Sequence, residues 1–209
     1  MSKKQALTEF HRGSILAAAE RLFSEKGTEK TTMDDIAREA EYSKATLYVY
    51  FQSKEEIINA ILLNGLILLR KKLGEAIEGH EDWTEGYRAV CEAIIRFYGE
   101  NPTAYDAISG EMEIGPDTAG SKGLQDIRRT GEEINGMLCA FLERGIQDGT
   151  VRSDLPVREM VHFFWATLSG MVRSAEPRNT YLNQAVASLD RPAFLAHGIQ
   201  LILDAFTRS

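Results

Sequence analysis

Three helix-start signals lie within residues 31–54, and they constrain the fold of this 209-residue chain more than any other feature. Thr32 can accept a hydrogen bond from a free backbone N–H, and Asp35 can reach back to it, as in a capping box. Ser43 can cap a second helix over residues 44–50, and Ser53 with Glu56 opens a third. Two short helices joined by a tight turn and followed by another helix form the layout of a helix-turn-helix unit.

The apolar residues of this segment predict which sides of the helices pack inward. The first helix should begin at residue 33, and spacings of three and four place its apolar side chains on one face: Met33, Ile36, Ala37 and Ala40. In the second helix we expect Ala45 and Val49 to pack inward, with Leu47 on the adjoining flank. The side chains left to face outward are those of Lys44, Thr46, Tyr48 and Tyr50. An amine, a hydroxyl and two phenols suit the base edges and phosphates of DNA.

Lys54 adds a further cation next to this segment. It lies in the first turn of the third helix, where the helix dipole disfavours a positive charge, so we expect another partner, namely a DNA phosphate. The predicted DNA-binding residues are Thr32, Ser43, Lys44, Ala45, Thr46, Tyr48, Tyr50 and Lys54.

Residues 12–58 resemble the DNA-binding domain of the TetR family of transcriptional regulators. The matching residues are Ile15, Leu16, Ala18, Ala19, Leu22, Phe23, Gly27, Thr31, Thr32, Ile36, Ala37, Ala40, Ser43, Thr46, Leu47, Tyr48, Phe51, Ser53, Lys54 and Glu55. Where this chain has Glu41 and Tyr42, the family usually has glycine and a branched aliphatic residue. Because glycine relieves strain at positive φ, Glu41 predicts either a cost of about 1 kcal/mol or a different turn. Ala45, where glycine is common, should firm up the helix.

The net charge of −7 argues at first against a nucleic-acid partner. However, residues 1–55 contain nine Lys and Arg and nine Asp and Glu, so the whole acidic excess lies in the rest of the chain. We therefore expect DNA affinity to depend on a few placed contacts, while the acidic remainder suppresses non-specific binding.

Beyond residue 55 the hydrophobic pattern stays helical, with no convincing strand. Helices are expected over residues 55–77, 83–99, 103–112, 123–147, 157–174 and 191–207, separated by Gly- and Pro-containing loops. The predicted fold is all-α with about nine helices: an N-terminal three-helix bundle containing the helix-turn-helix, and a C-terminal helical domain. The predicted domains are residues 1–55 for DNA binding and 56–209 for effector binding and dimerisation.

The family resemblance implies a small-molecule pocket and a dimer interface in the C-terminal part. The residues expected to line the pocket are Trp83, Tyr87, Phe97, Tyr98, Tyr105, Met112, Met137, Phe141 and Trp165. Those expected at the dimer interface, on the last two helices, are Phe164, Leu168, Met171, Phe194, Gly198, Ile202 and Ala205. An ordinary place in the core of one chain is the alternative for each residue of both sets. We expect no cofactor and no metal, because Cys91 and Cys139 are too few and too far apart in the sequence for a zinc site.

The remaining features favour a regulator over an enzyme. The four histidines are isolated, and the chain has no HExxH sequence, Gly-rich phosphate loop or GxSxG elbow. Cys91 and Cys139 are too few for a disulfide framework and are expected to be small buried residues. The N-terminus lacks the apolar core of a signal peptide, and the apolar runs are too short to span a bilayer, so we expect a cytoplasmic protein without a membrane partner.

The resemblance implies a homodimer that binds a palindromic DNA operator and a small-molecule effector. Two recognition helices about 34 Å apart would read the two half-sites. The predicted function is that of a ligand-responsive transcriptional regulator, a repressor released from its operator by the effector. The alternative is a helical adaptor that binds proteins and not DNA. It would explain the acidic charge, but it leaves a set of residues near the turn without a role: Lys44, Thr46, Tyr48, Tyr50 and Lys54.

Overall fold

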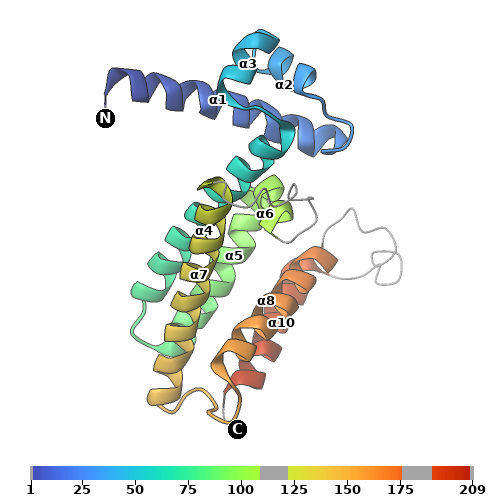
Figure 1. Cartoon of the computed structure of the whole chain (residues 1–209). Coiled ribbons are helices and arrows are strands. Elements are labelled where there is room, and N and C mark those ends of the chain that lie inside the picture. Colours follow the sequence, from blue (N-terminus) through green and yellow to red (C-terminus); the bar gives the residue numbers. More distant parts are fainter. Residues whose placement is uncertain (1, 109–121, 176–189, 208–209) are drawn as a thin grey trace. The chain divides into compact units, whose positions relative to one another are not determined.

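The computed structural model describes residues 2–108, 122–175 and 190–207 of the chain. Over these ranges it forms nine α-helices and no β-sheet strand, which confirms the predicted all-α class (Figure 1). Two compact units divide the chain: the first comprises residues 1–68 and 97–130, the second residues 69–96 and 131–209. In the described ranges no helix is long and apolar enough to cross a membrane.

The first unit begins with α1 (Lys3–Lys26), followed by the two short helices α2 (Met33–Glu39) and α3 (Lys44–Tyr50). It also contains the first part of α4 (Lys54–Glu78), together with α6 (Pro102–Ile108). Helices α2 and α3 pack on each other and on α1, as Figure 1 shows. This arrangement is the predicted helix-turn-helix. The predicted residues 109–112 of the α6 segment lie outside the described residues.

Around the helix-turn-helix, the core of the first unit is built from one face of each short helix, the residue after α3 and the middle of α1. Its members, each at most 6% exposed, are Ile15, Ala18, Ala19, Phe23, Ile36, Ala37, Leu47 and Phe51. The guanidinium of Arg12 packs against this core, because its Cζ lies 4.0 Å from the centre of the Phe51 ring. The same arginine donates a hydrogen bond to the backbone oxygen of Tyr50 at 2.6 Å, which fixes the end of α3 against α1.

The second unit contains the end of α4, most of α5 (Trp83–Glu100) and most of α7 (Lys122–Gln147). Its last helices, α8 (Val157–Ser174) and α10 (Arg191–Phe206), pack on each other. The predicted helix bounds agree with these to within a residue or two at the described ends. An isolated antiparallel bridge between Val151 and Thr207 joins the α7–α8 loop to the end of α10.

A stack of aromatic rings holds α5 against α7 in the second unit. Trp83 lies face to face with Tyr87 and with Phe141, at centroid distances of 5.6 and 5.1 Å. The indole N–H of Trp83 donates to the backbone oxygen of Phe141 at 2.8 Å, so its polar atom is satisfied although the side chain is 1% exposed. Tyr87 in turn donates to the backbone oxygen of Ile199 and connects α5 to α10.

Candidate nucleic-acid interface

The three predicted caps are present and determine where α2, α3 and α4 begin. Thr32 accepts from the backbone N–H of Asp35 at 3.1 Å, and the Asp35 carboxylate accepts from the backbone N–H of Thr32 at 3.1 Å. Ser43 accepts from the backbone N–H of Thr46 at 3.1 Å. Ser53 accepts from that of Glu56, although the Glu56 carboxylate reaches the backbone of Gln52 and not that of Ser53. Each cap satisfies a donor that the helix leaves free, so α2 and α3 are well defined despite their length.

The turn between α2 and α3 keeps the left-handed conformation in which glycine is usual. Glu41 has a φ of +61°, and among the described residues it is the only one other than glycine with positive φ. The backbone N–H of Tyr42 donates to the carbonyl of Ala37 at 2.8 Å, the long bond of a Schellman motif. The sequence left open either a strained Glu41 or a different turn. The structure shows the first: the turn has the conformation usual for glycine, and Glu41 is strained in it.

Tyr42 connects this turn to α1. Its hydroxyl lies 2.6 Å from Nδ1 of His11, and the two rings meet edge to face at 5.5 Å. The Tyr50 ring also contacts this imidazole, in a tilted arrangement with a centroid distance of 5.4 Å. His11 therefore contacts both the turn before α3 and the last residue of α3. Tyr50 is half-buried beside it, so the Tyr50 ring is less available to DNA than the sequence predicted.

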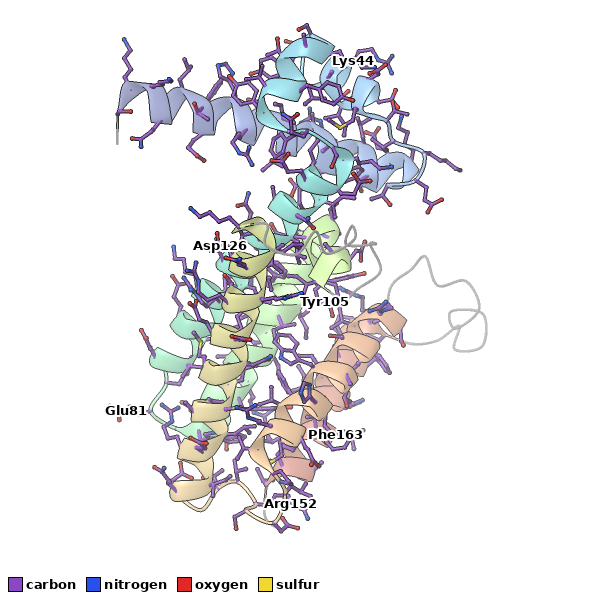
Figure 2. All side chains as sticks on the ribbon, viewed as in Figure 1. Lys44, Glu81, Tyr105, Asp126, Arg152 and Phe163 are labelled. Atoms are coloured by element: carbon purple, nitrogen blue, oxygen red, sulfur yellow. The ribbon has the colours of Figure 1, made fainter. Side chains whose placement is uncertain are left out.

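The exposed surface of α3 carries the predicted amine. Lys44 lies on the outer side of the helix pair, away from α1 (Figure 2). Its Nζ is 2.7 Å from a carboxylate oxygen of Asp34 on α2, and both side chains are 61% exposed. This contact raises the pKa of the Lys44 amine, first through the hydrogen bond and then through the charge of Asp34. In the free protein the predicted DNA-binding cation is thus paired with an acid that DNA would have to displace.

The other predicted contacts of α3 are placed unequally. Thr46 is half-buried, and its hydroxyl lies 2.8 Å from that of Ser43, so these two hydroxyls form one small polar site at the start of α3. The ring of Tyr48 is 37% exposed on the same outer side as Lys44, one helical turn further on. Tyr48 and Lys44 can therefore reach the same ligand.

Two residues expected to pack inward face solvent instead. Ala45 is exposed, and Val49 is 74% exposed, whereas Leu47 is completely buried. Two residues along an α-helix correspond to about 200°, so burying Leu47 necessarily turns both of its apolar neighbours outward. The helical spacing alone contained this information, and the inward assignment of Ala45 and Val49 was wrong.

Lys54 has partners within the protein that the sequence did not predict. Its Nζ donates to the backbone oxygens of Thr28 and Thr31, at 2.8 and 3.2 Å. These carbonyls follow α1, so the ammonium fastens the start of α4 to the loop before α2. A phosphate contact of Lys54 stays a prediction, and the structure gives this residue a structural role in addition.

Asp35 is the most strongly perturbed acid of the described helix-turn-helix. Its carboxylate accepts from Nζ of Lys26 at 2.8 Å, from the hydroxyl and backbone of Thr32, and from the guanidinium of Arg38. The hydrogen bond from Lys26, followed by those from Thr32, holds the pKa of Asp35 well below its usual value. Asp35 is therefore ionised at neutral pH and cancels part of the nearby positive charge.

The aromatic residues predicted to line a pocket are divided between the two units. Phe97, Tyr98 and Tyr105 belong to the first, where the rings of Tyr98 and Tyr105 meet edge to face at 4.4 Å. The second contains Trp83, Tyr87, Met137, Phe141 and Trp165. Met112 lies outside the described residues. Trp83, Tyr87, Phe97, Tyr98, Tyr105 and Phe141 are buried, while Met137 and Trp165 are half-buried.

Two of these residues border a small cavity inside the second unit. Its volume is about 20 Å³, enough for about one water molecule. Tyr87 and Phe141 line it with apolar side chains from α5, α7, α8 and α10: Val90, Leu138, Leu142, Val161, Phe164 and Phe206. Burial raises the pKa of the Tyr87 hydroxyl far above its usual value and that of the neighbouring Cys91 thiol to about 12. Both groups are therefore neutral, and the cavity is an apolar site without a charge.

The face of α8 and α10 expected to meet a second chain is largely covered within this one. Phe164, Leu168, Met171 and Ile202 are buried, and Gly198 lies so close to the Met171 sulfur that a Cβ there would collide with it. Phe194 is half-buried, and Ala205 is exposed. The exposed large apolar side chains of these helices are instead Leu201, at 69%, and Phe163, at 60%; Figure 2 labels Phe163 on α8. Most of the apolar residues on α8 and α10 that the sequence suggested for a dimer interface therefore pack against their own chain.

Residues 15–61, which contain the helix-turn-helix, match a known family model, that of the bacterial regulatory proteins of the tetR family. A curated relative is the HTH-type transcriptional repressor KstR2 of Rhodococcus jostii. It is 28% identical over 177 residues, which cover 84% of this chain and 85% of the relative.

Two solved structures extend the similarity over nearly the whole chain. The TetR family transcriptional regulator PfmR from Thermus thermophilus is 28% identical, with a TM-score of 0.71 over 90% of this chain and 96% of that one. The transcriptional regulator FadR from Bacillus subtilis, solved in complex with stearoyl-CoA, shares the fold with 19% identity and a TM-score of 0.70, covering 91% and 97% of the two chains. In its capped helix-turn-helix and in its all-helical remainder, this chain is similar to the TetR family of transcriptional regulators.

Proposed function

We propose that this protein is a homodimeric repressor that binds a palindromic DNA operator and is released from it by a small-molecule effector. The observation that carries the proposal is the outer surface of α3. Lys44 and Tyr48 are exposed there one turn apart, on a helix whose position is fixed by caps at both α2 and α3. A short, rigidly held helix with an exposed amine and phenol fits the major groove of DNA.

A dimer follows from the size of this site. Seven residues of α3 can read only a few base pairs, and two such helices about 34 Å apart read both halves of a palindrome. We place the dimer contact on the exposed side of α8 and α10, where Phe163 and Leu201 are the large apolar side chains exposed to solvent. Burying both against a second copy would remove apolar surface from water.

The effector is proposed to enter the apolar centre of the second unit. The cavity beside Tyr87 and Phe141 is lined by apolar side chains, which suit an apolar chain or ring. Because it has room for about one water molecule, a larger ligand can bind only if the surrounding helices move apart. A ligand that prefers the opened state by about 1 to 3 kcal/mol would switch the protein. FadR was solved with stearoyl-CoA, so acyl-CoA thioesters are the first class to test.

We propose a regulatory role and not an enzymatic one. The protein would act in the cytoplasm, where it would meet its DNA operator. The division of labour between residues 1–55 and 56–209 is part of the same proposal. The adaptor alternative makes a different prediction, because it gives the folded protein no affinity for DNA.

Selection of bound duplexes from a random pool, followed by fluorescence anisotropy at fixed ionic strength, tests the proposal. The wild type should select a palindromic sequence, and Lys44→Ala should weaken its binding by about 1 to 3 kcal/mol. Lys71→Ala is the matched control, because Lys71 is an exposed lysine that also forms an ion pair, with Glu75 on α4. A folded wild type that selects no sequence would refute the DNA-binding role and leave the adaptor.

A further inference from the structure

The outer surface of α3 contains an apolar column beside its polar one. Lys44 and Tyr48 form the polar column, and Ala45 and Val49, also four residues apart, form the apolar one. Residues four apart lie on the same side of a helix, and adjacent residues are turned by about 100°. The two columns therefore run side by side along the exposed surface.

The apolar column does not contribute to the core of the first unit. Val49 is 74% exposed and Ala45 is exposed, while Leu47 alone is completely buried among the side chains of α3. A β-branched residue is also a weaker helix former than most, so Val49 does not serve the helix that it belongs to. Its apolar surface is left free on the helix that we propose to lie in the major groove.

The major groove offers one apolar group to such a surface. Of the groups that base pairs present there, the C5-methyl group of thymine is the only one that is apolar, whereas the others accept or donate hydrogen bonds. Val49 cannot form a hydrogen bond through its side chain and would leave a base acceptor or donor without a partner. Contact with thymine avoids this loss and removes both apolar surfaces from water.

We propose that Val49, together with Ala45, determines operator specificity by packing against thymine methyl groups. The inference rests on the proposed DNA-binding function and assigns the part of the base code that this surface reads. Four residues, a rise of about 6 Å along the helix, separate the two side chains, and this distance lies between one and two base-pair steps of about 3.4 Å. Val49 and Ala45 can thus contact neighbouring or next-neighbouring base pairs within one half-site, beside the polar contacts of Lys44 and Tyr48.

The test replaces single thymines by deoxyuridine, which lacks only the methyl group, in the duplex that the wild type selects. The same symmetric replacement is made in both half-sites, one position at a time. At one position or more, the wild type should bind about fourfold more weakly for each methyl removed, the effect expected for one buried carbon. Val49→Ala should weaken binding to the thymine duplex and abolish the deoxyuridine effect at its own position.

Matched variants separate this reading from a general loss of affinity. Leu155→Ala removes an exposed aliphatic side chain outside α3 and should retain the full deoxyuridine effect. Val49→Thr keeps the shape but replaces one methyl group with a hydroxyl, and it should reduce the preference for thymine over deoxyuridine. Circular-dichroism melts of each variant establish that it is folded at the assay temperature.

Two results overturn the proposal in distinguishable ways. If the wild type selects a sequence but tolerates deoxyuridine at every position, Val49 does not read methyl groups, while the DNA-binding function stands. The same conclusion follows if the deoxyuridine effect remains unchanged in Val49→Ala and in Ala45→Ser. If the folded wild type selects no duplex at all, both this inference and the proposed function fail.

Discussion

Replacing Glu41 by glycine should stabilise the helix-turn-helix. Glu41 occupies the turn between α2 and α3 with a φ of +61°, in the region that is open to glycine but costs other residues about 1 to 2 kcal/mol. Glycine also loses more backbone freedom on folding, which offsets about 0.5 to 1 kcal/mol of this gain. The free energy of unfolding should therefore rise by up to about 1.5 kcal/mol.

Glu41→Ala is the matched control, because it removes the same side chain and charge but keeps a Cβ. Alanine is strained at this φ like glutamate, so its stability should stay close to that of the wild type. Urea unfolding followed by circular dichroism, at one protein concentration, measures both variants. If the glycine variant is no more stable than the alanine variant, the turn is not strained as described. Both variants lose one negative charge beside α3, so their affinity for DNA should rise alike.

The other predictions concern charged groups of the same unit. Asp34→Asn should free Lys44 and strengthen binding to the selected duplex, with a steeper salt dependence; unchanged anisotropy titrations would contradict the pairing described for the two residues. Lys54→Met should lower the melting temperature, because it removes the hydrogen bonds to two backbone carbonyls. If Lys54 also binds phosphate, the variant should reduce the salt dependence of DNA affinity by about one unit of slope per subunit. An unchanged slope would restrict Lys54 to its structural role. Asp35 has a lowered pKa in the folded protein, so its contribution to the free energy of unfolding is complete above the unfolded pKa of 3.8 and is lost as the pH falls below that value. In a plot of stability against pH, Asp35→Asn should therefore make the loss of stability in acid less steep. An equally steep loss would argue against the lowered pKa.

The fold was predictable from the sequence because its determinants are local. Capping residues mark the beginnings of α2, α3 and α4, and helical periodicity marks the lengths of the later helices. The burial of Leu47 within a seven-residue helix also implied that Val49 faces outward, since the angle between them follows from helix geometry alone. The outward position of Val49 was therefore predictable from the sequence, and only our assignment of Val49 to the inward face was wrong.

The remaining features of the site depend on contacts between segments that no spacing reveals. Asp34 and Lys44 meet because the turn at Glu41 directs α2 and α3 toward each other. Lys54 reaches the carbonyl of Thr28, 26 positions earlier in the chain, only once α4 has packed on the loop after α1. Whether an apolar stripe on α8 faces its own chain or a second copy is likewise decided by packing.

The most direct test of the central claim is the affinity of the protein for its selected palindrome when the two half-sites are moved apart by about half a helical turn, or about five base pairs. If two copies of α3 read the operator together, the insertion should reduce the affinity to that of a single half-site, and about ten inserted base pairs should restore part of it. Binding that is indifferent to the insertion, or a folded protein that binds every duplex equally, would contradict the account.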